Sequence, residues 1–140
     1  MSERYYFDTC IWRDHYENRF GLGGRPLGGY ATKLFIKILR KKDNLFFSEF
    51  IIRELKSDYK EEEIIKMLNI LFVSGVLKRV ELTEKDYKEA KSIGTMRNLP
   101  HGDVLHAILA RKSRAILVSQ DKHLQRLRDI VNVKRPEEII

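Results

Sequence analysis

Two aspartates follow short apolar runs near opposite ends of the chain, in positions typical of a reactive site in an α/β protein. Asp8 comes directly after residues 5–7 (YYF), and Asp121 follows residues 115–118 (AILV) with two residues between. Runs of this kind form buried strands, and ligands of open parallel sheets bind in the crevice beyond the carboxyl ends of the strands. We therefore expect both carboxylates at that edge of one sheet.

Two further carboxylates lie on segments with helical periodicity. At about 100° per residue, Glu54 falls on the apolar face of its helix beside Phe50 and Ile51, while Glu49 falls on the charged face. A buried carboxylate without a partner costs several kcal/mol, so Glu54 requires a cation, a hydrogen-bond partner or a proton. Asp103 opens an apolar helix, where the helix dipole favours its charge. Both positions are unusual for residues that serve only solubility.

Four carboxylates brought together repel one another unless divalent cations hold them. Oxygen ligands without paired His or Cys favour Mg²⁺ or Mn²⁺ over zinc. Such a centre can activate a water molecule and stabilise the charge that builds on a phosphodiester. One alternative stays open, in which Asp8 and Asp121 are turn residues, Asp103 caps its helix and Glu54 pairs with a core arginine.

Short apolar runs alternate with longer helical segments, a pattern that predicts an α/β fold with a central parallel sheet. The glycine-rich stretch 21–29 predicts a loop. Ser48 is expected to cap one helix, Thr83 and Asp86 to form a capping box on another, and Gly75 to end a third. The expected strands are 5–7, 45–47, 77–82, 115–118 and 130–133, and the expected helices are 31–42, 49–56, 61–73, 84–97 and 103–110.

The composition suits one compact domain spanning residues 1–140. Its 27 Lys and Arg against 20 Asp and Glu give a net charge of +7, which favours a polyanionic partner. The single cysteine, Cys10, excludes an intrachain disulfide and a cysteine zinc cluster. No stretch approaches the roughly 20 apolar residues of a membrane span, and the first residues lack the apolar run of a signal peptide. We expect a cytoplasmic protein without membrane contact.

The acidic residues stand in a characteristic order. Asp8-Thr9 follows a strand, Ser48 precedes Glu54 by six residues, Pro100-x-x-Asp103 opens an apolar helix, and Ser119-x-Asp121 follows a late strand. This set resembles the PIN-domain family, which includes the VapC-type toxin ribonucleases, and the resemblance extends from Tyr5 to about Val133. No single motif is specific, but the set of four in this order is.

The resemblance implies a three-layer α/β/α sandwich and a Mg²⁺- or Mn²⁺-dependent endoribonuclease that hydrolyses RNA. Carried over by position, the acidic metal ligands would be Asp8, Glu54, Asp103 and Asp121. Thr9 and Ser119 would be hydroxyl neighbours that orient the carboxylates or the attacking water. In many family members dimers form through the early helices and a small antitoxin protein covers the site, so the resemblance also implies a homodimer and an antitoxin partner.

Several residues near these motifs have two interpretations. His106, on an apolar helix, is expected to be packed rather than to shuttle protons, and His123 to be a solvated loop residue rather than an RNA contact. Trp12 is expected in the core or an interface. If RNA binds, the basic residues closest in sequence to the acidic centre are Lys122, Arg126 and Arg128. The glycine-rich stretch and His101-Gly102 depart from the compact family pattern.

Two other functions remain open from the sequence. The main rival keeps the fold without the chemistry, as a PIN-like module that binds RNA or acts as a scaffold. The second is a phosphatase or response-regulator-like domain, which also gathers carboxylates at strand ends. It is less attractive because no lysine follows a late strand in the expected place.

Overall fold

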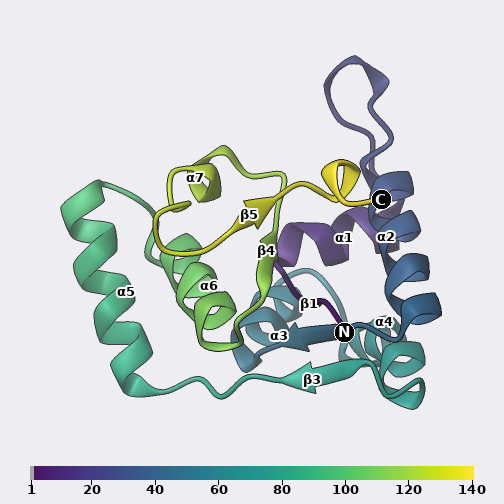
Figure 1. Ribbon diagram of the computed structural model, residues 1–140, viewed down its shortest axis with the longest axis horizontal. Helices are drawn as coiled ribbons and strands as arrows, with labels where there is room; N and C mark the ends of the chain where they lie inside the picture. The colour runs from purple at the N-terminus through teal and green to yellow at the C-terminus, as the bar shows by residue number, and fades with distance from the viewer. Residues whose placement is uncertain (1) are drawn as a thin grey trace.

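The computed structural model describes residues 2–140 and contains one five-stranded parallel sheet with strand order β3-β2-β1-β4-β5 (Figure 1). The central strand β1 pairs with both β2 and β4, and its three apolar residues are all buried. Burial on both faces explains why this strand is a continuous apolar run. The strands are β1 (Arg4–Phe7), β2 (Asn44–Phe47), β3 (Leu77–Arg79), β4 (Ile116–Val118) and β5 (Val133–Lys134).

Helices flank the sheet on both faces, which confirms the predicted α/β/α sandwich. The chain steps from β1 to β2 to β3, then returns past β1 to β4 and continues to β5. Since such crossovers are right-handed, the helices before β3 and those after it lie on opposite faces. The helices are α1 (Thr9–Glu17), α2 (Leu27–Lys41), α3 (Glu49–Lys56), α4 (Glu61–Val73), α5 (Glu84–Arg97), α6 (His101–Lys112) and α7 (Lys122–Gln125), with short 3-10 turns at Leu22–Gly24 and Pro136–Glu138.

The strands β1 and β4 are adjacent and parallel, but the connections that follow them run toward opposite edges of the sheet. From β1 the chain proceeds toward one edge of the sheet, and from β4 it proceeds toward the other. A reversal of this kind leaves a crevice at the carboxyl ends of the two strands, which is where open α/β sheets bind ligands. The residues that follow β1 and β4 are Asp8 and Ser119, so the fold brings two of the predicted motifs to this crevice.

The predicted ends of the helices 49–56, 61–73 and 84–97 agree with the structure, whereas the helix predicted over 103–110 extends from His101 to Lys112. The Ser48 hydroxyl accepts a hydrogen bond from Ile51 N at 3.4 Å at the start of α3. Thr83 and Asp86 exchange both bonds of a capping box, at 2.9 and 3.3 Å. Gly75, with φ at 77°, follows the end of α4. These caps satisfy backbone groups that a helix end otherwise leaves without partners.

The expected loop 21–29 is wrong in its last three residues, because α2 begins at Leu27 and not at residue 31. Gly28 packs directly on α1: a Cβ at this position would lie 2.5 Å from the Cα of Asn18 and 2.6 Å from the carbonyl oxygen of Asp14. The glycine therefore permits a close helix–helix approach and not a flexible turn. Helix α1, which the sequence did not predict, supplies the other side of this contact.

The end of the chain also differs from expectation. The last strand comprises only Val133–Lys134, whereas residues 130–133 were predicted, and the short helix α7 was not predicted. The third strand ends at Arg79 and not at residue 82.

Among the described residues, no helix has both the length and the apolar character needed to cross a membrane.

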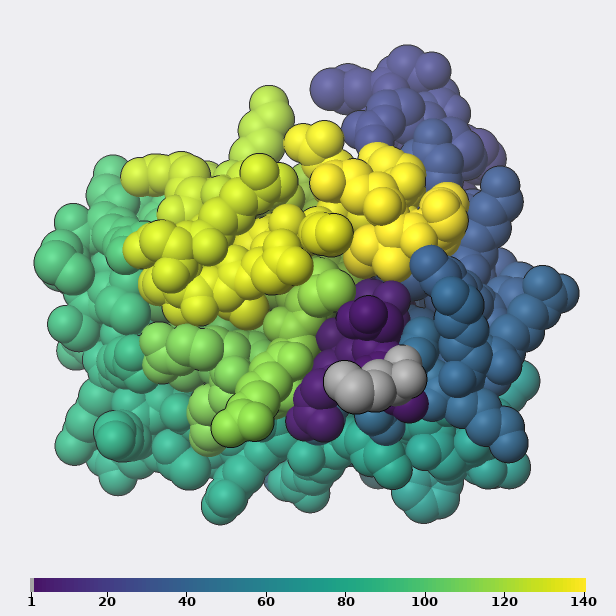
Figure 2. Space-filling view, viewed as in Figure 1, coloured from purple at the N-terminus to yellow at the C-terminus, as the bar shows by residue number. Residues whose placement is uncertain are grey.

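The connection between α1 and α2 projects from the surface beside the C-terminal residues (Figure 2). Two apolar side chains on it are largely exposed, Phe20 at 66% and Leu22 at 94%. An ion pair between Arg25 and Glu137 connects the loop to the C-terminal 3-10 turn. The other carboxylate oxygen of Glu137 accepts a hydrogen bond from the side chain of Gln120 at 2.7 Å. Gln120 lies between Ser119 and Asp121, so this loop is connected to the crevice.

Candidate functional site

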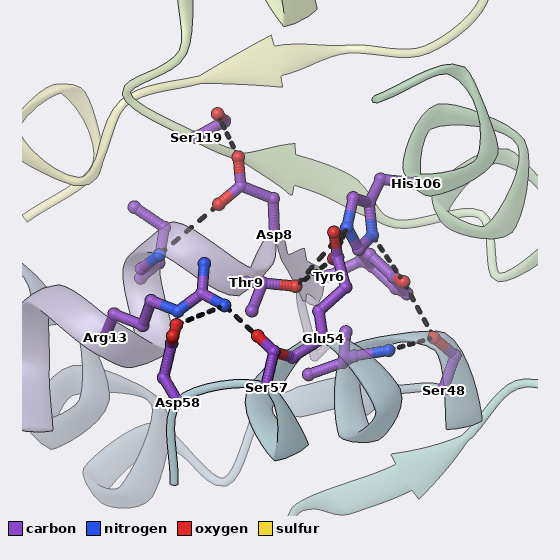
Figure 3. Close-up of polar contacts among 12 residues, drawn as sticks. Tyr6, Asp8, Thr9, Arg13, Ser48, Glu54, Ser57, Asp58, His106 and Ser119 are labelled. Carbon is purple, nitrogen blue, oxygen red and sulfur yellow. Dashed lines mark hydrogen bonds and ion pairs between the residues drawn. The ribbon is translucent and has the colours of Figure 1, made fainter. Parts of the chain in front are cut away.

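Asp8 lies at the centre of the crevice and is almost fully buried, with 3% exposure. It ends β1 and caps α1, because its Oδ1 accepts a hydrogen bond from Ile11 N at 3.3 Å. Its backbone N donates to the carbonyl oxygen of Val118 at 3.1 Å, which holds the ends of β1 and β4 together. The Ser119 hydroxyl donates to Oδ2 of Asp8 (Figure 3). Among residues 2–140, the carboxylate of Asp8 accepts hydrogen bonds from Ile11 N and Ser119 and forms no ion pair with a lysine or arginine.

Burial raises the pKa of Asp8 from 3.8 to about 6. The charge of His106 and the hydrogen bonds from Ser119 and Ile11 act in the opposite direction, while the charge of Asp121 raises the pKa further. Because removing a carboxylate from water disfavours its charged form, these neighbours only partly compensate the burial.

Asp103 and Asp121 meet at the same edge of the sheet, together with His123. One ligand atom from each of the three lies within 4.8 Å of the other two. The His123 Nδ1 atom is 3.2 Å from Oδ2 of Asp103 and 3.6 Å from Oδ1 of Asp121. Asp121 caps α7 by accepting from His123 N at 2.8 Å, and its own N donates to the Ser119 hydroxyl at 2.9 Å. Ser119 therefore bridges the Asp8 side of the site and the Asp121 side.

The electrostatics of Asp103 resemble those of Asp8. Burial raises its pKa, the neighbouring charge of Asp121 raises it further, and His106 and His123 lower it. A carboxylate whose pKa is raised by a neighbouring carboxylate lies closer to it than the two negative charges favour. A divalent cation between them would remove this repulsion.

Glu54 forms the opposite wall of the site and is about one-third exposed. Its Oε1 accepts hydrogen bonds from the Thr9 hydroxyl at 2.5 Å and from Nε2 of His106 at 2.7 Å (Figure 3). Burial alone would raise the pKa of Glu54, but the bonds and charges of His106 and Thr9, together with the charge of Arg13, outweigh it and lower the pKa. Glu54 is therefore held as a carboxylate.

The expectation that Glu54 points into an apolar face is corrected by these contacts. The fully buried residues of α3 are Ile51 and Leu55, and the side chain of Glu54 instead meets polar groups from α1 and α6. Arg13 does lie nearby, but its guanidinium donates to the backbone oxygen of Glu54, at 3.0 Å, and pairs with the carboxylate of Asp58. Helical periodicity placed Glu54 on the inner side correctly but could not show that this side is polar.

His106 continues a chain of hydrogen bonds into the core. Its ring is 3% exposed, and Nδ1 lies 2.9 Å from the Tyr6 hydroxyl, which lies 2.9 Å from the Ser48 hydroxyl. When Nε2–H donates to Glu54, Nδ1 of a neutral ring accepts from Tyr6. His106 is packed, as expected, but it also fixes the orientation of Glu54. Its position one helical turn after Asp103 was the available signal for this role.

The structure places all four predicted acids and both hydroxyl neighbours around one crevice. In residues 2–140, no ion pair joins Asp8, Glu54, Asp103 or Asp121 to a lysine or arginine. The alternative interpretation made Asp8 and Asp121 turn residues and Asp103 a cap, whereas Asp8 and Asp121 are the N-caps of α1 and α7 and Asp103 lies in the first turn of α6, after the N-cap Pro100. A cap leaves carboxylate lone pairs free for a metal ion. His123, expected to be a solvated loop residue, belongs to this group, while His101 lies apart, 3.4 Å from the Thr95 hydroxyl.

A family model described as PIN domain matches residues 5–130 of the chain. The fold is also similar to three solved structures. A chain of VapBC2 from Rickettsia felis, determined with a DNA fragment of its promoter, is 18% identical with a TM-score of 0.65, and the match covers 94% of this chain and 98% of that one. The search of curated protein sequences finds no match.

The second similar structure is FitAcB from Neisseria gonorrhoeae, at 14% identity and a TM-score of 0.63, covering 96% of this chain and 99% of the other. The third is PAE2754 from Pyrobaculum aerophilum, at 18% identity and a TM-score of 0.56, covering 99% and 95%. At these identities the similarity shows a shared fold. It does not transfer any residue's role to this chain.

Proposed function

Because the chain belongs to the PIN-domain family, whose members are generally nucleases, we propose that it is a metal-dependent endoribonuclease. The single observation that carries the proposal is the arrangement at the crevice. Carboxylates from four separate segments converge there, and those of Asp8 and Asp103 have raised pKa values. A site that served only structure would pair such carboxylates with lysine or arginine, since unpaired buried charges are costly.

The donors fit a divalent cation of the Mg²⁺ or Mn²⁺ class. Asp8, Glu54, Asp103 and Asp121 offer carboxylate oxygens, which such cations prefer, and His123 adds a nitrogen that Mn²⁺ accepts more readily than Mg²⁺. When bound, the ion supplies the charge that activates a water molecule and neutralises the phosphodiester.

Neighbouring groups of the chain orient the proposed metal ligands. Thr9 and His106 hold the carboxylate of Glu54 in one orientation, and Ser119 with Ile11 N does the same for Asp8. Fixed carboxylates lower the cost of arranging water and phosphate for in-line attack on phosphorus. This positioning accounts for polar groups that would otherwise be an expensive way to fill a core.

RNA is the proposed substrate. The net charge of +7 favours a polyanion, and Lys122 and Arg126 lie on or beside α7, next to the acidic centre, with Arg128 following. Phosphates that approach the crevice along this segment meet positive charge before they meet the carboxylates.

Two of the similar structures, VapBC2 and FitAcB, support a further part of the proposal. We infer that this chain acts as the toxin of a toxin–antitoxin pair, that it forms a homodimer, and that a small antitoxin protein covers its crevice. Co-expression of the chain with the product of a neighbouring small reading frame, followed by co-purification and growth measurement, tests this part separately from the chemistry.

The chemistry is tested by incubating the chain with a labelled single-stranded RNA in Mg²⁺, in Mn²⁺ and in chelator. We expect cleavage only with metal, and loss of cleavage in Glu54→Gln. The matched control is Glu49→Gln, which changes an exposed glutamate on the same helix. Binding of RNA without metal and without cleavage would instead support the scaffold function, and hydrolysis of a small phosphomonoester in place of RNA would support a phosphatase.

A further inference from the structure

A cavity of about 270 Å³ lies between α3, α5 and α6. Helix α5 packs along α6 beside it (Figure 1). Its walls include the rings of Phe50 and Tyr87, and its base includes Ala90 and Leu105, both 2% exposed. The lining is therefore mainly apolar and aromatic, which is the character of a small-ligand site.

Gly102 separates this cavity from the acidic centre. A Cβ at Gly102 would lie 3.2 Å from Cζ of Phe50 and 4.0 Å from Oε2 of Glu54. Gly102 therefore lies between a wall of the cavity and the carboxylate that is proposed to act on phosphate. Phe50 connects the two regions as well, since its ring centroid is 4.9 Å from that of His106.

One basic side chain lines the cavity and a second lies beside its wall. Lys91 lines it and is exposed, and the guanidinium of Arg53 lies 6.0 Å from the centre of the Tyr87 ring while donating a hydrogen bond to its hydroxyl. Aromatic walls with basic side chains close by suit a ligand that contains both a flat aromatic ring and a negatively charged group. A nucleotide has both parts, and its base is linked to its phosphate through one sugar.

We propose that this cavity binds one nucleobase of the RNA strand, beside the phosphate that is cleaved. The inference rests on the proposed function and adds a place where the enzyme holds its substrate. The base stacks on Phe50 or Tyr87 while Lys91 contacts the adjoining phosphate. Stacking tolerates every base, so the cavity selects an unpaired nucleotide over a paired one.

The test measures binding of a labelled six-nucleotide RNA to the full chain carrying Asp8→Asn, with Mg²⁺ present. In one series each nucleotide in turn is replaced by an abasic residue. We expect the loss of one particular base to weaken binding about tenfold, as single stacked bases do elsewhere. Equal binding of every abasic oligomer would overturn the proposal.

A second series fills the cavity. Ala90→Leu adds a branched side chain to its base, and Lys88→Leu adds the same side chain at an exposed position of α5 that does not line it. We expect Ala90→Leu to weaken binding of the intact RNA about tenfold and to remove the abasic effect, while Lys88→Leu changes neither. Tyr87→Ala, at a partly exposed position, should weaken binding in the same way if Ala90→Leu fails to fold.

Two other measurements separate the possible failures. If Ala90→Leu converts a dimer to a monomer in light scattering and binds RNA like its parent, the cavity is an interface between copies and the proposal is wrong. If no metal supports cleavage but one abasic position still weakens binding, the nuclease function fails and the base site stands. If cleavage needs metal but no abasic position matters, only the base site fails.

Discussion

Two aspartates of this protein have little exposed surface and yet differ in what surrounds them. Asp86, 5% exposed, accepts a hydrogen bond from the Lys112 ammonium at 2.7 Å, and its bonds to Lys112 and Thr83 outweigh burial and lower its pKa. Asp8, 3% exposed, has no such cation, and burial raises its pKa to about 6. Asp86 is paired with a lysine of the same chain, whereas Asp8 has no lysine or arginine partner among residues 2–140, as expected of the proposed metal ligand.

The largest effect should come from removing the charge at Asp8. Asp8→Asn is expected to lower the rate of RNA cleavage by about a hundredfold or more, since it removes a proposed metal ligand. Its free energy of unfolding at neutral pH should be unchanged or higher, by up to about 3 kcal/mol, because the native state no longer confines an unfavourable charge. Cleavage assays and thermal melts of the same preparation give both values. Cleavage at the parent rate would remove Asp8 from the site.

The opposite pattern is expected at Asp86. Asp86→Ala should lower the free energy of unfolding by about 2 kcal/mol, because the Thr83 capping box and the Lys112 pair are both lost. RNA cleavage by the folded fraction should not change. Denaturant unfolding measures the first effect and an initial-rate assay measures the second. A loss of activity without a loss of stability would break the distinction between the two aspartates.

Variants of His106 test whether this side chain acts on catalysis by positioning Glu54. His106→Leu removes the bond to Glu54 and should lower kcat about tenfold with little change in KM, as loss of an outer hydrogen bond does at other metal sites. His106→Gln, which keeps a donor, should recover part of the rate. Arg111→Gln, at an exposed position of the same helix that does not line the cavity, serves as the control. Equal losses in the Leu and Gln variants, matched by lower stability, would indicate packing alone.

The smallest effect is the pH dependence of stability without metal. Because the native pKa of Asp8, about 6, lies above its ordinary value of 3.8, the native state holds a proton that the unfolded chain has released. The contribution of Asp8 to stability is therefore present below about pH 4 and is lost as the pH rises through 6, by roughly 1 kcal/mol or more. Subtracting the unfolding curves of Asp8→Asn from those of the parent isolates it. A difference that does not vary over this range would contradict the raised pKa.

Local signals made most of the fold predictable. The boundaries of α3, α4 and α5 follow from Ser48, Gly75 and the Thr83 capping box, because caps act within one turn of the residues that encode them. The start of α2 was missed because a glycine-rich stretch usually indicates a loop, and Gly28 belongs to such a stretch although it lies in the helix. Only the approach of Asn18 explains why a glycine is required there.

In the candidate site, too, the residues with local sequence signals were predicted and those that depend on distant contacts were not. Asp8 and Asp121 were placed correctly because the ends of parallel strands meet at one edge, whatever the rest of the chain does. His106 was assigned to packing alone because its partners, Tyr6 and Glu54, come from segments 100 and 52 residues away. His123 was misplaced because α7 was not predicted. Contacts of this kind depend on the fold and not on sequence spacing.

The most direct test of the account is a calorimetric titration of the full chain with Mn²⁺ at neutral pH. We expect saturable binding that disappears in Asp103→Asn and survives in Asp129→Asn, which changes an exposed aspartate paired with Arg97. Saturating Mn²⁺ should also raise the melting temperature of the parent and not of Asp103→Asn. Equal behaviour of the parent and Asp103→Asn, with or without binding, would mean that these carboxylates do not form a divalent-ion site.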